Sequence, residues 1–155
     1  MTRWVAVLSP AFLMTSPAQS QAPATASPVE EARLAPQRLL IHVTQGPESP
    51  TRAALAFNVA KAALDEGHTV ALFLAGDAVQ LIRTDVLGSL SGLGTGNLKE
   101  LYEGIVAKGG RLYLSMGSSK ARGVTEADLA GKPAEFAGPP KLVQLTLTFD
   151  RALTY

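Results

Sequence analysis

Short apolar runs alternate with segments of helical periodicity from residue 38 to the end of the chain, and this alternation restricts the fold more than any other feature of the sequence. The first run, LLIHV at residues 39–43, contains β-branched residues and is bounded by turn residues, which is typical of a buried strand in a parallel sheet. Further short runs follow it. We therefore expect strands at residues 39–43, 70–75, 112–114, 135–137 and 152–155.

The first segment between strands carries the signals of a helix. Residues 53–64 place alanines, Phe57 and Leu64 at helical spacing. Ser49 can cap this helix, with Pro50 at its first position, where a missing N–H costs nothing. Gly67 is expected to end it.

The later helices are shorter. Asp77 is expected to cap a short helix over 78–83, and Asn97 a helix with the apolar face Leu98, Leu101, Ile105 and Val106. Thr125 and Asp128 have the spacing of a capping box, which predicts one more short helix.

Residues 140–149 carry two conflicting signals. Apolar and polar residues alternate over 145–150, which by pattern alone indicates a strand. The Pro139-Pro140 pair suits a helix N-terminus, and a crossover between parallel strands needs an element on the face of the sheet. We therefore predict a helix over 140–149.

This order of elements predicts a three-layer α/β/α domain with a five-stranded parallel sheet. Ligands of such sheets bind outside the carboxyl ends of the strands, where we expect the loops 44–52, 76–79 and 115–122. The glycine-rich stretch 88–96 is expected to be a flexible loop. It follows no predicted strand and lacks the dinucleotide fingerprint spacing, so it does not predict nucleotide binding.

The N-terminal residues differ from the rest of the chain. Arg3 precedes an apolar run of about eleven residues, and small residues follow at Ala18, Ser20 and Ala22, as in a secretory signal peptide. We predict a signal peptide over 1–22, a flexible Pro/Ala-rich linker over 23–37, and a periplasmic or secreted domain over 38–155. The alternative is an N-terminal extension on a cytoplasmic protein.

Charge and cysteine content exclude several functions. Apart from Arg3, thirteen basic side chains face thirteen acidic ones, which argues against nucleic acid or, once the signal is cleaved, a membrane surface as a partner. The chain contains no cysteine. It can therefore form no disulfide, thiolate nucleophile, persulfide or cysteine-ligated metal site.

The chain resembles the DsrE/DsrF-like family. The resemblance rests on GPESPTRAALAFNVAKAALDEGHTVALFLAGDAV at 46–79, ARGVTEADLAG at 121–131 and the end DRALTY, and it covers nearly all of 38–155. It implies a flavodoxin-like Rossmannoid domain assembled as a homo-trimer or hexamer. The characterised relatives are sulfur-relay proteins that carry a persulfide on a cysteine after the third strand.

Serines occupy the positions that matter for this chemistry. Many relatives of this branch show a Cys-Gly-x-Cys stretch where this chain has Ser115-Met116-Gly117-Ser118. Sulfur relay needs a thiolate that attacks a sulfane sulfur and then holds it, and a serine hydroxyl cannot form a persulfide. The family activity is therefore not expected in this chain alone.

The loops at the carboxyl edge supply the candidate ligand-binding residues, which are Arg52, Asp77, Ser115, Ser118 and Arg122. Arg52 and Arg122 are expected near helix N-termini, where they would favour a small anion. The predicted third strand brings the hydroxyls of Ser115 and Ser118 to the same edge of the sheet. The alternative, which we prefer, is that Asp77 caps its helix and pairs with one arginine as a structural clamp. Met116 is expected to be an apolar plug and Lys120 a solvated base.

The two histidines predict neither catalysis nor a metal site. His42 lies inside the first strand, and His68 follows Gly67 at the opposite edge of the sheet from the candidate loops. No nucleophile–base–orienter triad can be assembled from them, and they cannot share a metal. We therefore predict no cofactor, no metal and a non-catalytic domain that binds a small anion or a protein partner. The alternative is a sulfur-relay or thiol-redox accessory that acts with a partner's cysteine.

Overall fold

The computed structural model describes residue 1 and residues 35–155. The predicted signal peptide, from residue 2 on, and most of the predicted linker lie outside the described residues. No helix among the described residues is long and apolar enough to cross a membrane.

Five parallel strands form the central sheet. They are β1 (Arg38–Val43), β2 (Thr69–Leu74), β5 (Arg111–Ser115), β6 (Ala134–Ala137) and β7 (Arg151–Thr154). Their spatial order is β6-β5-β2-β1-β7, and every neighbouring pair is parallel. All five predicted strands and the predicted parallel sheet are confirmed.

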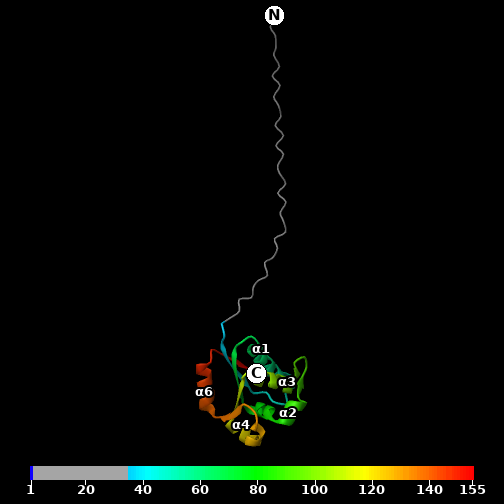
Figure 1. The fold of residues 1–155 in the computed structure, drawn as a ribbon, viewed down its shortest axis with the longest axis vertical. Coiled ribbons are helices and arrows are strands. Elements are labelled where there is room, and N and C mark those ends of the chain that lie inside the picture. The colour runs from blue at the N-terminus through cyan, green and yellow to red at the C-terminus, as the bar shows by residue number, and fades with distance from the viewer. Residues whose placement is uncertain (2–34) are drawn as a thin grey trace. The chain divides into compact units, whose positions relative to one another are not determined.

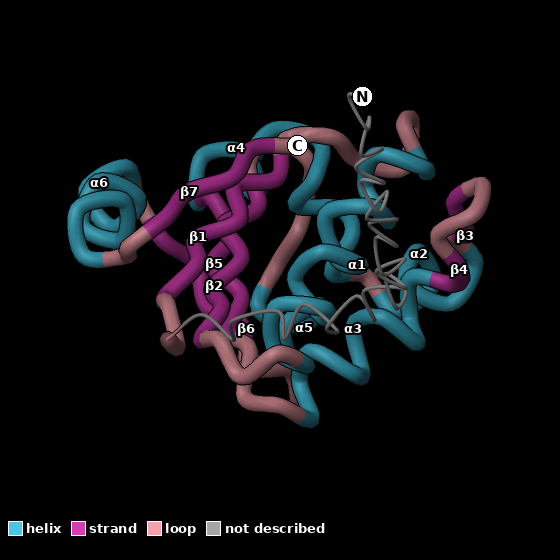
Figure 2. The backbone as a smooth tube through the Cα atoms, turned by 90° about the horizontal axis from the view of Figure 1, so that it is seen from above, coloured by secondary structure: helices cyan, strands magenta, loops and turns pink. Residues whose placement is uncertain are grey.

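One face of the sheet carries most of the core. The long helices α1 (Pro50–Asp65) and α3 (Leu98–Ala107) cover it, together with the 3₁₀ helix η1 (Gly76–Ile82) and the short helices α2 (Thr84–Ser89) and α5 (Glu126–Leu129). Figures 1 and 2 show α1, α2 and α3 on the same side of the strands. The buried surface of α1 consists largely of alanines, and small side chains let a helix backbone approach a sheet closely.

The opposite face is covered by one helix, α6 (Pro139–Thr148), which lies apart from the others in Figure 2. Its buried Leu145 packs with Leu40, Ala71, Phe73 and Ala137 of the sheet. The helix predicted over 140–149 is therefore confirmed against the alternating pattern. The alternating threonines fit a helix because the hydroxyls of Thr146 and Thr148 donate to the carbonyls of Leu142 and Gln144, at 2.9 and 2.8 Å.

Two predicted loops turn out to be ordered elements. The expected flexible loop 88–96 contains the end of α2 and a small hairpin of β3 (Ser91–Gly92) and β4 (Gly96–Asn97). The hairpin is held on α1 because the Leu93 N–H donates to Oγ1 of Thr51 at 3.1 Å. The expected loop 115–122 contains the six-residue helix α4 (Met116–Ala121).

The capping predictions have mixed outcomes. The Asn97 side chain accepts from the Lys99 N–H, and the Asp128 carboxylate accepts from the Thr125 N–H at 2.8 Å, both as predicted. The predictions for Ser49 and Asp77 are wrong in part. Ser49 precedes α1 without a side-chain cap hydrogen bond, and the residue before η1 is Ala75, which places Asp77 inside the first turn.

Candidate functional site

The ends of β1, β2 and β5 meet at the carboxyl edge of the sheet, as predicted. Gly46, after β1, lies directly against the start of η1, after β2. A Cβ on Gly46 would lie 2.4 Å from the carbonyl oxygen of Asp77, so this position accepts only glycine without a shift of the backbone. The loop before α1 and the turn into η1 are therefore in direct contact.

The face of α4 with Ser115 and Ser118 packs on η1. The Ser115 side chain caps α4 by accepting a long, 3.5 Å hydrogen bond from the Ser118 N–H. The Ser118 hydroxyl accepts a hydrogen bond from the Gly76 N–H at 3.0 Å. Gly76 has a φ of +56°, which favours glycine, and its N–H would otherwise have no helix partner at the first turn of η1. Ser118 thus joins the loops after β2 and β5.

An ion pair completes this contact. The Nε of Arg122 donates to Oδ1 of Asp77 at 2.7 Å, and its Nη1 donates to the Ser118 carbonyl at 3.4 Å. The backbone carbonyl of Arg122 accepts in turn from Arg83 at 2.9 Å. Both members of the ion pair are partly exposed, so it contributes up to about 1 kcal/mol. The arginine–aspartate clamp that we preferred as the alternative to ligand binding is therefore present, although Asp77 is not the N-cap of η1.

Four of the five predicted site residues are therefore brought together: Asp77, Ser115, Ser118 and Arg122. Arg52 is exposed on the first turn of α1. Among the described residues no hydrogen bond or ion pair joins it to the other four.

The face of α4 next to the one with Ser115 and Ser118 borders a pocket of about 280 Å³ with mostly apolar walls. Its lining residues are Met116, Ser119, Lys120, Gly123, Val124, Thr125 and Phe136. Sequence reasoning missed this pocket. If 116–121 had been recognised as a helix, the spacing of Met116, Ser119, Lys120 and Gly123 would have placed them on one face. The prediction that Met116 is a plug is wrong, because 58% of its surface is exposed.

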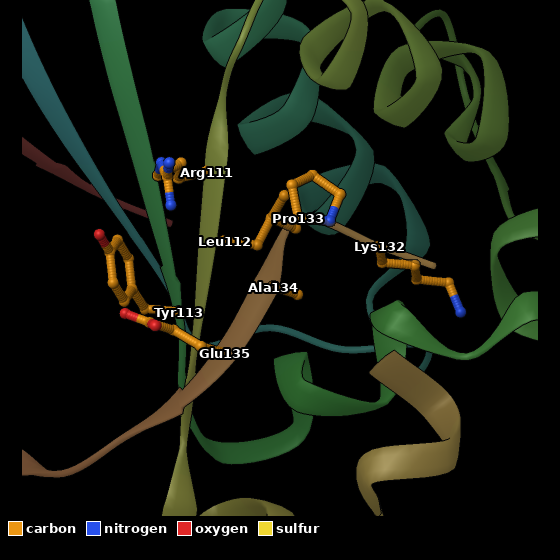
Figure 3. Close-up of a pocket in the computed structure, with 7 residues that line it drawn as sticks. All are labelled: Arg111, Leu112, Tyr113, Lys132, Pro133, Ala134 and Glu135. Atoms are coloured by element: carbon orange, nitrogen blue, oxygen red, sulfur yellow. The ribbon is translucent and has the colours of Figure 1, made fainter. Parts of the chain in front are cut away.

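A second, smaller pocket of about 160 Å³ lies along β5 and β6. Figure 3 shows Arg111, Tyr113 and Glu135 on one side of these strands and Lys132 on the other, so Lys132 does not converge with the other charged side chains. Tyr113 instead takes the ammonium group of Lys141 from α6 over its ring, at 5.1 Å from the ring centre. This contact ties α6 to the sheet.

The histidines lie where the sequence predicted them, at separate ends of the sheet. His68 Nδ1 accepts from the Gln37 N–H at 3.1 Å, at the amino end of β2. His42 in β1 is half-buried with its ring 6.0 Å from that of Phe73, and burial lowers its pKa. Among residues 35–155 no three His, Asp or Glu side chains are close enough to hold a metal ion.

Comparison with known proteins agrees with the fold. The crystal structure of YchN from Escherichia coli matches with a TM-score of 0.63 and 22% identity, over 77% of this chain and 99% of YchN. A conserved protein of unknown function, BT1422 from Bacteroides thetaiotaomicron, matches with a TM-score of 0.56 and 15% identity, over 77% of this chain and 95% of its own. No curated protein matches. The model of the DsrE/DsrF-like family matches residues 37–155, and the chain therefore belongs to the DsrE/DsrF-like family.

Proposed function

We propose that this chain is an exported DsrE/DsrF-like domain in an accessory, non-catalytic role, which binds a small anion or a protein partner at the carboxyl edge of its sheet. One observation carries the proposal. At one of the two positions where the family resemblance puts a cysteine, the Ser118 hydroxyl accepts a hydrogen bond from the Gly76 N–H at 3.0 Å and serves as a structural contact.

The chemistry of that contact supports binding over sulfur transfer. A hydroxyl has a much higher pKa than a thiol and holds no sulfane sulfur, and the chain has no other thiol to use. Arg122 can still serve an anion. Its guanidinium has five N–H donors, and its contacts with Asp77 and Ser118 use two of them. An anion can therefore bind Arg122 without breaking the ion pair.

A persulfide-transfer assay with a sulfane donor tests the proposal. We expect no bound sulfur on the natural protein. We expect sulfur on Ser118→Cys, because the Gly76 N–H and Arg122 would stabilise a thiolate there. Ser89→Cys, on the exposed end of α2, is the matched control for non-specific reaction of a surface thiol. Sulfur turnover by the natural protein alone would contradict the proposal.

The same assay separates the alternative, a relay that uses a partner's cysteine. A thiol protein added in trans would then turn over faster with the natural chain than without it. Arg122→Gln would remove that acceleration, since the guanidinium is the cation beside Ser118.

A homo-oligomer, trimeric or hexameric, is part of the proposal. The family resemblance is its main support. Two further observations agree with it: α6 leaves Val143 and Leu147 exposed at 57% and 80%, and all four residues of the edge strand β7 are exposed. Exposed apolar side chains on α6, the one helix on its face of the sheet, are suited to contact a second copy of the chain.

A further inference from the structure

The pocket beside α4 has a composition that suits a particular kind of ligand. Its walls come from three elements: Met116 from α4, Val124 from the turn before α5, and Phe136 from β6. Its volume of about 280 Å³ is close to the lower end of ligand pockets, about 300–1,000 Å³. The space therefore fits a small apolar body.

A buried serine lines this pocket, and its hydroxyl has no partner among the described residues. Ser119 lines the pocket and is 2% exposed, and its Oγ has no hydrogen-bond partner among the described residues. Buried polar groups in proteins are almost always paired, and an unpaired one indicates a missing partner. A rotation about the Cα–Cβ bond of Ser119 would let this hydroxyl donate to an oxygen atom that enters the pocket.

One side chain in the wall of the same pocket is positively charged. Lys120 lines it and is exposed, and no carboxylate among residues 35–155 pairs with its ammonium group. The other wall residues are uncharged. The pocket therefore combines apolar walls, one hydroxyl donor and one positive charge.

From this combination we infer that the pocket binds small amphiphilic monocarboxylates, with the apolar body against Met116, Val124 and Phe136 and the carboxylate held by Ser119 and Lys120. This site differs from the one in the proposed function, since Ser115, Ser118 and Arg122 line a neighbouring face of α4 that makes contacts with η1, and none of them lines the pocket. It does not depend on whether the chain carries sulfur.

Benzoate and hexanoate are suitable probes, with benzamide and hexanamide as neutral counterparts of the same shape. A titration of the ¹⁵N-labelled full chain, followed by NMR, reports the amides of residues 116–125 and 136. We expect saturable shifts at those amides with dissociation constants on the order of 1 mM, as for ligands of few atoms. The acids should bind about threefold more tightly than the amides, as one exposed ion pair permits.

Two variants assign the roles. Lys120→Gln should abolish the preference for the acid, and Lys99→Gln, an exposed lysine on α3, should leave it unchanged. Ser119→Ala should weaken both acid and amide about fivefold, because it removes the donor that either head group uses. Neither variant removes a hydrogen bond that holds the fold.

The proposal is overturned by any of three results: no saturable shift at the pocket amides, equal binding of acids and amides, or binding that Ser119→Ala and Lys120→Gln leave unchanged. Ser118→Ala keeps the two proposals distinct. It alters the site at η1, and it should leave benzoate binding unaffected whatever the persulfide assay shows.

Discussion

Two adjacent serines on α4 have opposite surroundings, and exchanging each for alanine should change stability in opposite directions. Ser118→Ala removes the acceptor of the Gly76 N–H and leaves that donor unpaired in a partly buried place. The lost hydrogen bond and the unpaired N–H cost about 2 kcal/mol together, and the higher helix propensity of alanine returns about 0.5 kcal/mol. We expect the free energy of unfolding to fall by about 1.5 kcal/mol.

Ser119→Ala has the same gain in helix propensity and removes a buried hydroxyl that has no partner among the described residues. Relief of its desolvation adds about 1 kcal/mol, so the free energy of unfolding should rise by about 1.5 kcal/mol. For a domain of this size the two variants should then differ in Tm by about 10 °C.

Urea and thermal unfolding followed by far-UV circular dichroism measure both values. Because the two substitutions share the same chemistry, helix and propensity, their difference isolates the environment of each hydroxyl. Equal effects would show that α4 does not present Ser118 to Gly76. A loss of stability in Ser119→Ala would show that its hydroxyl is hydrogen-bonded in solution.

Three further predictions concern pH, assembly and export. Burial lowers the pKa of His42, so the folded state binds fewer protons than the unfolded chain, and the free energy of unfolding should fall as the pH drops below the ordinary histidine pKa of about 6.5. Urea titrations at several pH values should show a smaller dependence of this free energy on pH in His42→Gln, and an unchanged dependence would contradict the prediction. Light scattering at micromolar concentration should give a trimer or its dimer, which Leu147→Lys weakens, while a monomer mass for the natural protein would disprove the oligomer. Intact-mass measurement on protein from its native host should show cleavage after Ser20 or Ala22, and a chain still starting at Met1 would refute export.

The strands and long helices could be predicted because their signals are local. A buried parallel strand needs a continuous apolar run, and a helix on a sheet needs apolar side chains every three to four residues. The helix α6 shows how such signals combine. Its alternating pattern favoured a strand, whereas the proline pair Pro139-Pro140 and the need for a crossover correctly predicted a helix. The threonines of the pattern are compatible with a helix because their hydroxyls can donate to carbonyls within it.

The short elements could not be predicted, because their order depends on distant contacts. The glycine-rich hairpin of β3 and β4 has no periodic pattern, and it is held by Thr51 on α1, which lies 42 positions before Leu93 in the sequence. Six residues of α4 span fewer than two turns, too few for a periodicity to be recognised.

The sequence by itself determined the parallel α/β fold, the absence of a thiol and the meeting of Asp77, Ser118 and Arg122 at the carboxyl edge, since each follows from residue type and from the order of strands. Only the tertiary structure decided which way α4 is turned. Ser118 and Ser119 are neighbours of the same type, and no local pattern tells them apart. Packing of α4 against η1 directs Ser118 to the Gly76 N–H, and because side chains one position apart point about 100° away from each other on a helix, the same packing places Ser119 in the wall of the pocket.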